Sequence, residues 1–155
     1  MPVEDIDKGW NALAQQVAKL SGEPHVLIGV QGAQAASTHP GPGEAVTNAQ
    51  IASWNEFGTG RIPARSFIRE TIDINQAPLL ALTQKFGSAV LDARIGPAQA
   101  LGLLGEHTRG LMIQRITAKI LPLNRPSTIK RKGSETPLIA FTGTLKNSIT
   151  FVVKG

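Results

Sequence analysis

Residues 137–153 read PLIAFTGTLKNSITFVV, and this stretch decides the fold at the C-terminal side of the chain. The turn Thr-Gly-Thr-Leu separates two apolar runs, which predicts a loop that caps one short helical turn. Ile149, Phe151 and Val153 then alternate with their neighbours, and a period of two is typical of a strand. The stretch carries no pattern of catalytic residues, so its expected role is structural.

Composition indicates an ordinary globular domain. A chain of 155 residues, 41% hydrophobic and 17% charged, fits a single domain over 1–155. Because cysteine is absent, disulfides and thiolate metal sites are excluded, and cytoplasmic synthesis is the default expectation. The acidic start lacks the features of a signal peptide, and no apolar run is long enough to cross a bilayer. We therefore expect a soluble protein without a membrane partner.

Positive charge gathers in the last quarter of the chain. The formal net charge is +5, and residues 119–155 hold seven Lys or Arg against Glu135 alone. Such a region can attract nucleic acid, dock on acidic protein surfaces or remain a solvated face. The run Lys130, Arg131 and Lys132 is the best nucleic-acid signal, but no aromatic residues are interleaved with it. A solvated face or a protein contact is favoured over sequence-specific readout.

The first third of the chain predicts a helix, a strand and a loop. Apolar residues at spacings of three and four predict an amphipathic helix over 3–20: Val3, Ile6, Trp10, Leu13, Val17 and Leu20. Residues 26–30 indicate a strand. Residues 32–45 are rich in Gly, Ala, Ser, Thr and Pro, which predicts a long flexible loop. In an assembly protein such a loop is either an idle loop or an arm that orders on a neighbouring subunit.

The middle of the chain predicts several helices separated by Gly and Pro. Asn48 is expected to cap a helix through Phe57 that Gly58 ends. After an extended segment at 61–65, the next helix should begin near residue 66 or 67. A break is expected at Pro78, with Asn75 as the cap of a new helix.

The following helix is expected to run from Gly96-Pro97 to about Lys119. Its glycines at 102, 105 and 110 lower helix propensity, which suggests close backbone contacts at those positions. A connector at 121–126 should lead to a short basic helix that Ser127 caps and Gly133 ends.

Signals for catalysis are weak. His25, His39 and His107 lack the spacing of ligands on one helix face, so no metal site is expected. Glu106 and His107 are adjacent and therefore point about 100° apart on a helix. The glycine pairs lack the pattern of a dinucleotide or phosphate loop. We expect no catalytic residues, no metal and no cofactor, and hence no enzyme.

Three short blocks carry a resemblance to a known family. They are NEFGT at 55–59, IPARSF at 62–67 and PLIAFTGTLKNSI at 137–149, in that order. In this order the chain resembles the tail-completion and head–tail joining proteins of tailed bacteriophages, the HK97-like and Mu-type virion morphogenesis group. The likeness covers roughly residues 46–73 and 121–153.

The resemblance implies an α+β fold, with helices packed against a small antiparallel β-sheet. It implies a structural virion protein that is made in the host cytoplasm and forms a homo-oligomeric ring, a hexamer in this group, at the neck. Its partners would be further copies of itself, the portal or connector, and tail terminator or tube proteins, with genomic DNA passing through the lumen without sequence specificity. A tail terminator or tube-associated subunit is a near alternative, and a basic DNA-binding accessory protein is a more distant one.

Candidate interface residues follow from the motif blocks and the basic run. They are Trp54, Glu56, Phe57, Arg61, Arg65, Phe67, Arg69, Lys130, Arg131 and Lys132. Glu56 is expected to pair with Arg61, Arg65 or Arg69. The pair could join two subunits or stabilise a loop within one chain.

Overall fold

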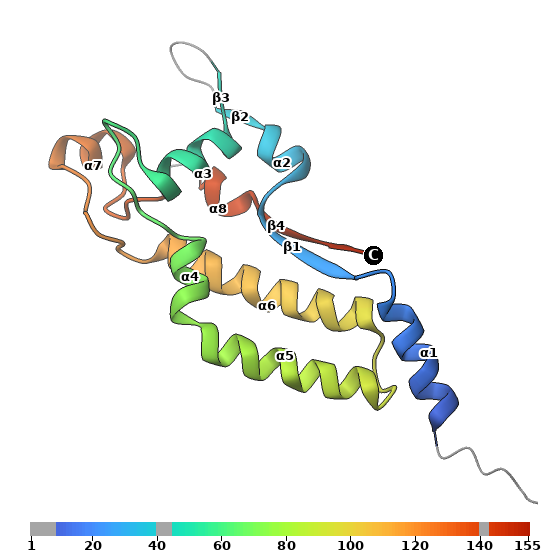
Figure 1. The fold of residues 1–155 in the computed structure, drawn as a ribbon. Helices are drawn as coiled ribbons and strands as arrows, with labels where there is room; N and C mark the ends of the chain where they lie inside the picture. Colours follow the sequence, from blue (N-terminus) through green and yellow to red (C-terminus); the bar gives the residue numbers. More distant parts are fainter. Residues whose placement is uncertain (1–8, 40–44, 140–142) are drawn as a thin grey trace, which may run out of the picture.

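The computed structural model describes residues 9–39, 45–139 and 143–155, which form eight helices and four strands (Figure 1). The helices are α1 Trp10–Leu20, α2 Gly32–Ala36, α3 Asn48–Phe57, α4 Arg69–Ile74, α5 Gln76–Leu91, α6 Pro97–Thr117, α7 Pro126–Lys132 and α8 Thr144–Asn147. The strands are β1 His25–Val30, β2 Thr38–His39, β3 Val46–Thr47 and β4 Ile149–Lys154.

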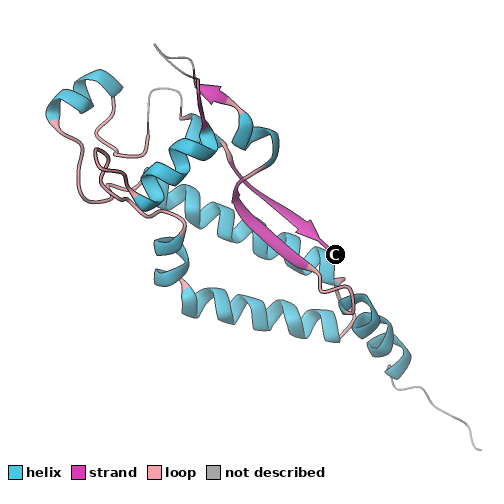
Figure 2. Cartoon of the chain, turned by 45° about the horizontal axis from the view of Figure 1, so that its top comes forward, coloured by secondary structure: helices cyan, strands magenta, loops and turns pink. Residues whose placement is uncertain are grey.

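The main sheet joins the segment that follows α1 to the C-terminal segment of the chain. β1 and β4 pair antiparallel, with His25 opposite Lys154 and Val30 opposite Ile149 (Figure 2). β2 and β3 form a second, very short antiparallel pair. Helices pack against this small sheet, so the predicted α+β class is confirmed.

The long helix α6 is the centre of the fold. It packs against both strands of the main sheet and against α5, which runs beside it (Figure 1). Gly105 permits the approach to the sheet, because a Cβ there would lie 2.6 Å from the Phe151 ring. Gly102 and Gly110 have nothing within 4 Å of such a Cβ. The expectation of close contact is therefore confirmed for one of the three glycines and wrong for the other two.

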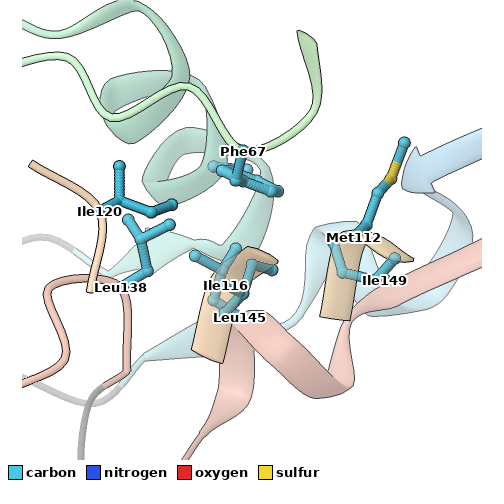
Figure 3. Close-up of a cluster of buried hydrophobic side chains, with 8 residues drawn as sticks. Phe67, Met112, Ile116, Ile120, Leu138, Leu145 and Ile149 are labelled. Carbon is cyan, nitrogen blue, oxygen red and sulfur yellow. The ribbon is translucent and has the colours of Figure 1, made fainter. Parts of the chain in front are cut away.

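The main core gathers toward the C-terminal end of α6 (Figure 3). Its side chains come from segments far apart in sequence. Contributions come from α3, the 66–68 segment, α6 and the residues after it, the 138 region, α8 and β4. They are Ala52, Phe67, Met112, Ile116, Ile120, Leu138, Leu145 and Ile149. The motif blocks at 62–67 and 137–149 thus meet in one apolar cluster.

Several predicted boundaries are confirmed. α6 begins after Gly96 and ends at Thr117, close to the expected Lys119, and Gly133 ends α7 with a left-handed φ of 67°. The break before Pro78 lies at Asn75, between α4 and α5. The helical turn and the strand expected after the Thr-Gly turn are α8 and β4, although residues 140–142 lie outside the described chain.

The predicted caps at the starts of α3 and α7 are wrong. Thr47 rather than Asn48 caps α3, because its hydroxyl accepts from the Gln50 backbone N–H while Gln50 Oε1 accepts from the Thr47 N–H at 2.8 Å. At α7 the N-cap is Arg125 rather than the expected Ser127, and it makes no side-chain cap bond because a guanidinium has no acceptor.

Asn75 is the N-cap residue of α5, as expected, but it makes no side-chain cap bond. Its side-chain amide donates instead to the Thr71 carbonyl at 2.7 Å.

The expected loop over residues 32–45 is partly wrong. Residues 32–36 form α2 and residues 38–39 form β2, while residues 40–44 lie outside the described chain. Asn48 holds the segment against α3, because its Nδ2 donates to the Gln34 carbonyl at 2.8 Å and its backbone N–H donates to the Ser37 carbonyl at 3.0 Å. The helix expected over 3–20 is confirmed from Trp10, and residues 3–8 are not described.

Candidate functional site

The first candidate feature is a buried carboxylate at the start of α4. Glu56 is 5% exposed, and its oxygens accept hydrogen bonds from the Ser66 hydroxyl and from three successive backbone N–H groups. Those N–H groups belong to Phe67 at 2.8 Å, Ile68 at 2.9 Å and Arg69 at 3.1 Å. The first N–H groups of a helix have no partner within the helix and favour a negative charge. The helix expected near residue 66 or 67 begins at Arg69, and the N–H groups bound by Glu56 lead into its first turn.

The surroundings of Glu56 keep it ionised. Burial alone would raise the pKa of this carboxyl, but the Ser66 hydroxyl and the three backbone N–H groups outweigh burial and hold the pKa below its ordinary value. Arg69 Nε lies 3.8 Å from the carboxylate, and its guanidinium also lies 5.8 Å above the centre of the Phe57 ring. The predicted pair therefore forms with Arg69 and lies within one chain.

The second feature is a buried arginine that links two sequence blocks. Arg65 is 6% exposed, and its backbone N–H donates to the Asn55 carbonyl at 2.6 Å. Its Nε donates to the Pro122 carbonyl at 2.7 Å and its Nη2 to Asn124 Oδ1 at 3.2 Å. Burial lowers the pKa of this guanidinium, although arginine stays charged in proteins. Arg65 thereby fixes the 55–65 loop to the connector that precedes α7.

The loop between α3 and Arg65 is tight for identifiable reasons. Gly58 has a φ of 77°, and a Cβ there would lie 2.9 Å from the Ala64 backbone nitrogen. The Thr59 hydroxyl accepts from the backbone N–H groups of Arg61 and Ile62, and the Thr59 N–H donates to the Ile62 carbonyl. The residues Gly58 and Thr59 thus fold the chain back so that Arg65 can reach the connector.

A groove of about 970 Å³ lies between this loop and the segment from the connector to α7. We call it the basic groove. Its lining includes five cationic residues and no acidic one: Arg61, Arg65, Arg125, Arg131 and Lys132.

Lys132 and Arg65 are the more enclosed cations of the basic groove. Lys132 Nζ donates to the Pro137 carbonyl at 2.6 Å. Burial, followed by the charges of Arg65 and Arg131, lowers the pKa of Lys132. The neighbouring positive charges lower the pKa of Lys132 because the described lining of the groove supplies no carboxylate to offset them.

A third feature is an apolar surface on α1. Trp10 is 73% exposed, Val17 is 52% exposed and Leu20 also faces solvent. The residue of α1 that is buried is Gln16, and no donor in the described chain reaches its Oε1. We call Trp10, Val17 and Leu20 the α1 stripe. Helix α1 therefore shows the amphipathic pattern expected from its sequence, but it leaves much of its apolar side uncovered.

The candidate interface residues occupy three different environments. Phe67 is fully buried in the core, and Glu56 and Arg65 are buried and bonded within the chain. In the described chain these three side chains are enclosed within one copy, and a role for them at an interface stays a prediction. Surface positions remain at seven residues: Trp54, Phe57, Arg61, Arg69, Lys130, Arg131 and, half-buried, Lys132.

Sequence reasoning missed the partners of Glu56 and Arg65. Backbone N–H groups and carbonyls supply most of their bonds, and no residue type marks such groups in a sequence. It also missed that Arg61 and Arg65 lie across one groove from Arg131 and Lys132. The shared positive charge of these four residues was the signal in the sequence that could have indicated the groove.

The described histidines and carboxylates offer no metal cluster. Within residues 9–39, 45–139 and 143–155 there is no group of three or more that could hold an ion. Glu106 pairs instead with Arg109 Nη1 at 3.0 Å, and Arg109 Nε donates to the Ile149 carbonyl. His25 Nδ1 lies 3.0 Å from the Glu23 carbonyl oxygen. Among the described helices, none combines the length and apolar character that a bilayer crossing requires.

Similarity to known proteins does not identify a function for these sites. Comparisons with models of protein families, with curated proteins and with solved structures find no match for this chain. A function must therefore be argued from the surfaces of the chain itself.

Proposed function

We propose that this chain is a structural virion protein of a tailed bacteriophage that forms a homo-oligomeric ring at the head–tail junction. In this role it completes the tail and joins it to the portal or connector, without catalysis. The α1 stripe is the observation that carries the proposal. An amphipathic helix whose apolar side faces solvent in the monomer is what a subunit with a missing neighbour presents.

The motif blocks that carry the family resemblance support the same proposal. The blocks at 62–67 and 137–149 supply Phe67, Leu138, Leu145 and Ile149 to one core, while Glu56 and Arg65 hold the intervening loop. Glu56 and Arg65 thus serve the architecture of the chain. Glu106 pairs with Arg109, and His25 Nδ1 lies beside the Glu23 carbonyl oxygen.

Assembly of copies into a ring requires two different surfaces on each subunit. A heterologous contact joins one surface of a copy to another surface of the next, and it closes when the rotation between copies returns to the first. The α1 stripe can supply one surface. Leu27 and Val152, which lie opposite each other on the outer face of the main sheet and are both exposed, add apolar area on the same subunit.

Molar mass by light scattering tests the proposal on the purified full chain in low and high salt. We expect a multiple of the 16.4 kDa chain that persists in high salt, because apolar contacts are not screened. Electron microscopy should show rings, either alone or after addition of phage tails. A chain that stays monomeric in both salts and does not attach to tails would contradict the proposal.

A basic DNA-binding accessory protein is the second candidate, and the basic groove is the observation that favours it. Phosphate contacts predict affinity for DNA that falls steeply as salt rises. A stable monomer with strong, salt-sensitive DNA binding would favour this candidate over the ring. A tail terminator or tube-associated subunit would share the ring but bind a different partner at the tail.

A further inference from the structure

The basic groove has more positive charge than the chain around it can offset. Arg65 and Lys132 are anchored by carbonyl groups, whereas the side chains of Arg61, Arg125 and Arg131 are exposed at the groove. No ion pair with a carboxylate is formed by these three arginines in the described part of the chain. Arginine presents a planar fork of N–H donors that matches a carboxylate, so the groove suits a ligand with several oxyanions.

The same chain carries a matching acidic segment. Glu4, Asp5 and Asp7 are three of its 11 acidic residues and fall within four positions. This segment precedes α1, whose stripe is the surface assigned above to subunit contact. Residues 1–8 lie outside the described chain, and the number of residues between Glu4 and Gly9 sets an upper limit on how far the acidic segment can reach from α1.

The acidic segment cannot reach the groove of its own copy. Gly9 and Trp10 lie beside Asp92 and Ala93, just before α6 begins, whereas the groove lies beyond the end of α6 at Pro122 and Asn124. The 21 residues of α6 extend about 30 Å. Glu4 stands five residues before Gly9 and can therefore reach at most about 18 Å from it. Figure 1 shows the same separation, with α1 and α7 at opposite ends of the molecule.

We infer that residues 4–7 of one copy bind in the basic groove of the neighbouring copy, where their carboxylates pair with Arg61, Arg125 and Arg131. The inference rests on the proposed ring and names one of its contacts. It gives each copy an acidic end and a basic end, which is the arrangement that a head-to-tail closed contact needs. Opposite charges at such a contact select the register and the partner.

A nucleic acid strand is a poorer occupant of the basic groove. Proteins that bind single strands combine basic grooves with aromatic side chains on which bases stack. The lining of the groove contains no aromatic residue. Nucleic acid is therefore an outcome that the experiments must separate from the acidic segment.

A charge swap on the full chain tests the contact. The variant R61E/R125E/R131E should assemble at concentrations at least about tenfold higher than the unmodified chain, because the groove then repels the acidic segment. Adding E4K/D5K/D7K to the same chain should restore assembly. Lys130→Glu is the matched control, since Lys130 is an exposed cation of α7 that does not line the groove, and it should assemble normally.

A peptide measurement tests the contact independently of the ring. The probe is an acetylated peptide of residues 2–9, added to ¹⁵N-labelled full chain carrying V17E, which disrupts the α1 stripe and keeps the protein monomeric. We expect chemical-shift changes around residues 61, 125 and 131, and an affinity lowered at least about tenfold by R61E/R125E/R131E. A control peptide with the substitutions E4Q, D5N and D7N, which remove the three negative charges, should not bind.

The outcomes separate this inference from the proposed ring. A ring that forms equally well with the reversed groove would overturn the inference and leave the ring intact. Peptide binding at the groove by a chain that never forms rings would support the charge contact and contradict the proposed function. Failure of the peptide to bind, together with loss of duplex DNA binding in the reversed-groove variant, would overturn the inference in favour of nucleic acid.

Discussion

The two ends of α6 differ in how much buried core lies beside them, because the main apolar core lies at the C-terminal end, although Phe57, Leu121 and Leu123 are exposed on the surface there. At the C-terminal end, Phe67 is 0% exposed and Ile116 and Ile149 are equally enclosed, while charged groups nearby are bonded. At the N-terminal end, α1 and the last residue of α5 leave Trp10 and Leu91 open to solvent. We call these the closed end and the open end. The core at the closed end stabilises the monomer, and the contacts between molecules proposed above use the open end.

The largest effect on monomer stability is expected from the closed end. Phe67→Ala removes a ring from a site with no solvent access, which should cost about 3–5 kcal/mol in the free energy of unfolding. This is a large part of the unfolding free energy of an ordinary domain. Urea titration measures the loss, and thermal unfolding is used instead if the variant is barely folded. Trp10→Ala is the control at the open end and should change the unfolding midpoint little. Equal losses for the two variants would break the comparison.

A second test concerns the charge at the closed end. Glu56→Gln keeps the shape but removes the anion that accepts from three backbone N–H groups, and it should cost about 1.5–3 kcal/mol by urea unfolding. Glu106→Gln changes an exposed carboxylate that pairs with Arg109, and its cost should stay below about 1 kcal/mol. A loss at Glu56 no larger than the loss at Glu106 would contradict the role of the buried carboxylate.

The pH dependence of stability sharpens the same point. Because the pKa of Glu56 is lowered in the folded chain from an ordinary value of 4.5, its contribution is complete above that value. The contribution is lost as pH falls through the lowered folded pKa. The unfolding midpoint of the unmodified chain should therefore drop below about pH 4.5, and Glu56→Gln should show a smaller drop over the same range. Identical slopes for the two chains would assign the acid sensitivity to other groups.

Two glycines of α6 give a smaller effect with opposite signs. Gly105→Ala places a Cβ 2.6 Å from the Phe151 ring and should cost about 1–3 kcal/mol. Gly102→Ala, on the same helix with nothing within 4 Å, should stabilise the chain by up to about 1 kcal/mol. Thermal unfolding of both variants checks the pair. A stabilising Gly105→Ala would show that the sheet does not press on α6 as described.

The smallest effect on the monomer is expected at the open end. Val17→Glu alters a side chain that is 52% exposed, so the unfolding free energy should change by no more than about 0.5 kcal/mol. The same variant should lose assembly in light scattering, because it places a charge in the α1 stripe. An α1 variant that unfolds readily but still assembles would reverse the assignment of the two ends.

The sequence was sufficient for elements whose ends are marked by backbone chemistry. Pro97, Gly133 and Gly58 restrict or permit particular φ values, and each marks an end of a helix where expected. The strand at 149–154 also follows from its alternation. The pairing of β1 with β4 had no local signal, because it depends on contacts between segments far apart in the chain.

The functional surfaces were less predictable for a different reason. Periodicity shows that α1 has an apolar side, but it cannot tell a side that faces the core from one that faces another molecule. The buried Gln16 and the exposed Trp10 reverse the usual arrangement, and three-dimensional packing was needed to see it. The basic groove was hidden similarly, because Arg61 and Arg131 are brought together by the connection from Arg65 to Pro122 and Asn124.

The pairing of β1 with β4 also bears on the order of events during synthesis. His25 leaves the ribosome early and meets Lys154 more than a hundred residues later, so β1 has no main-sheet partner on a nascent chain that has not reached residue 149. Contacts between distant residues form late because loop closure costs entropy before they gain energy. Leu145 and Ile149 also complete the core at that stage. Translation thus delays the finished subunit, and incomplete chains are kept out of any assembly that requires it.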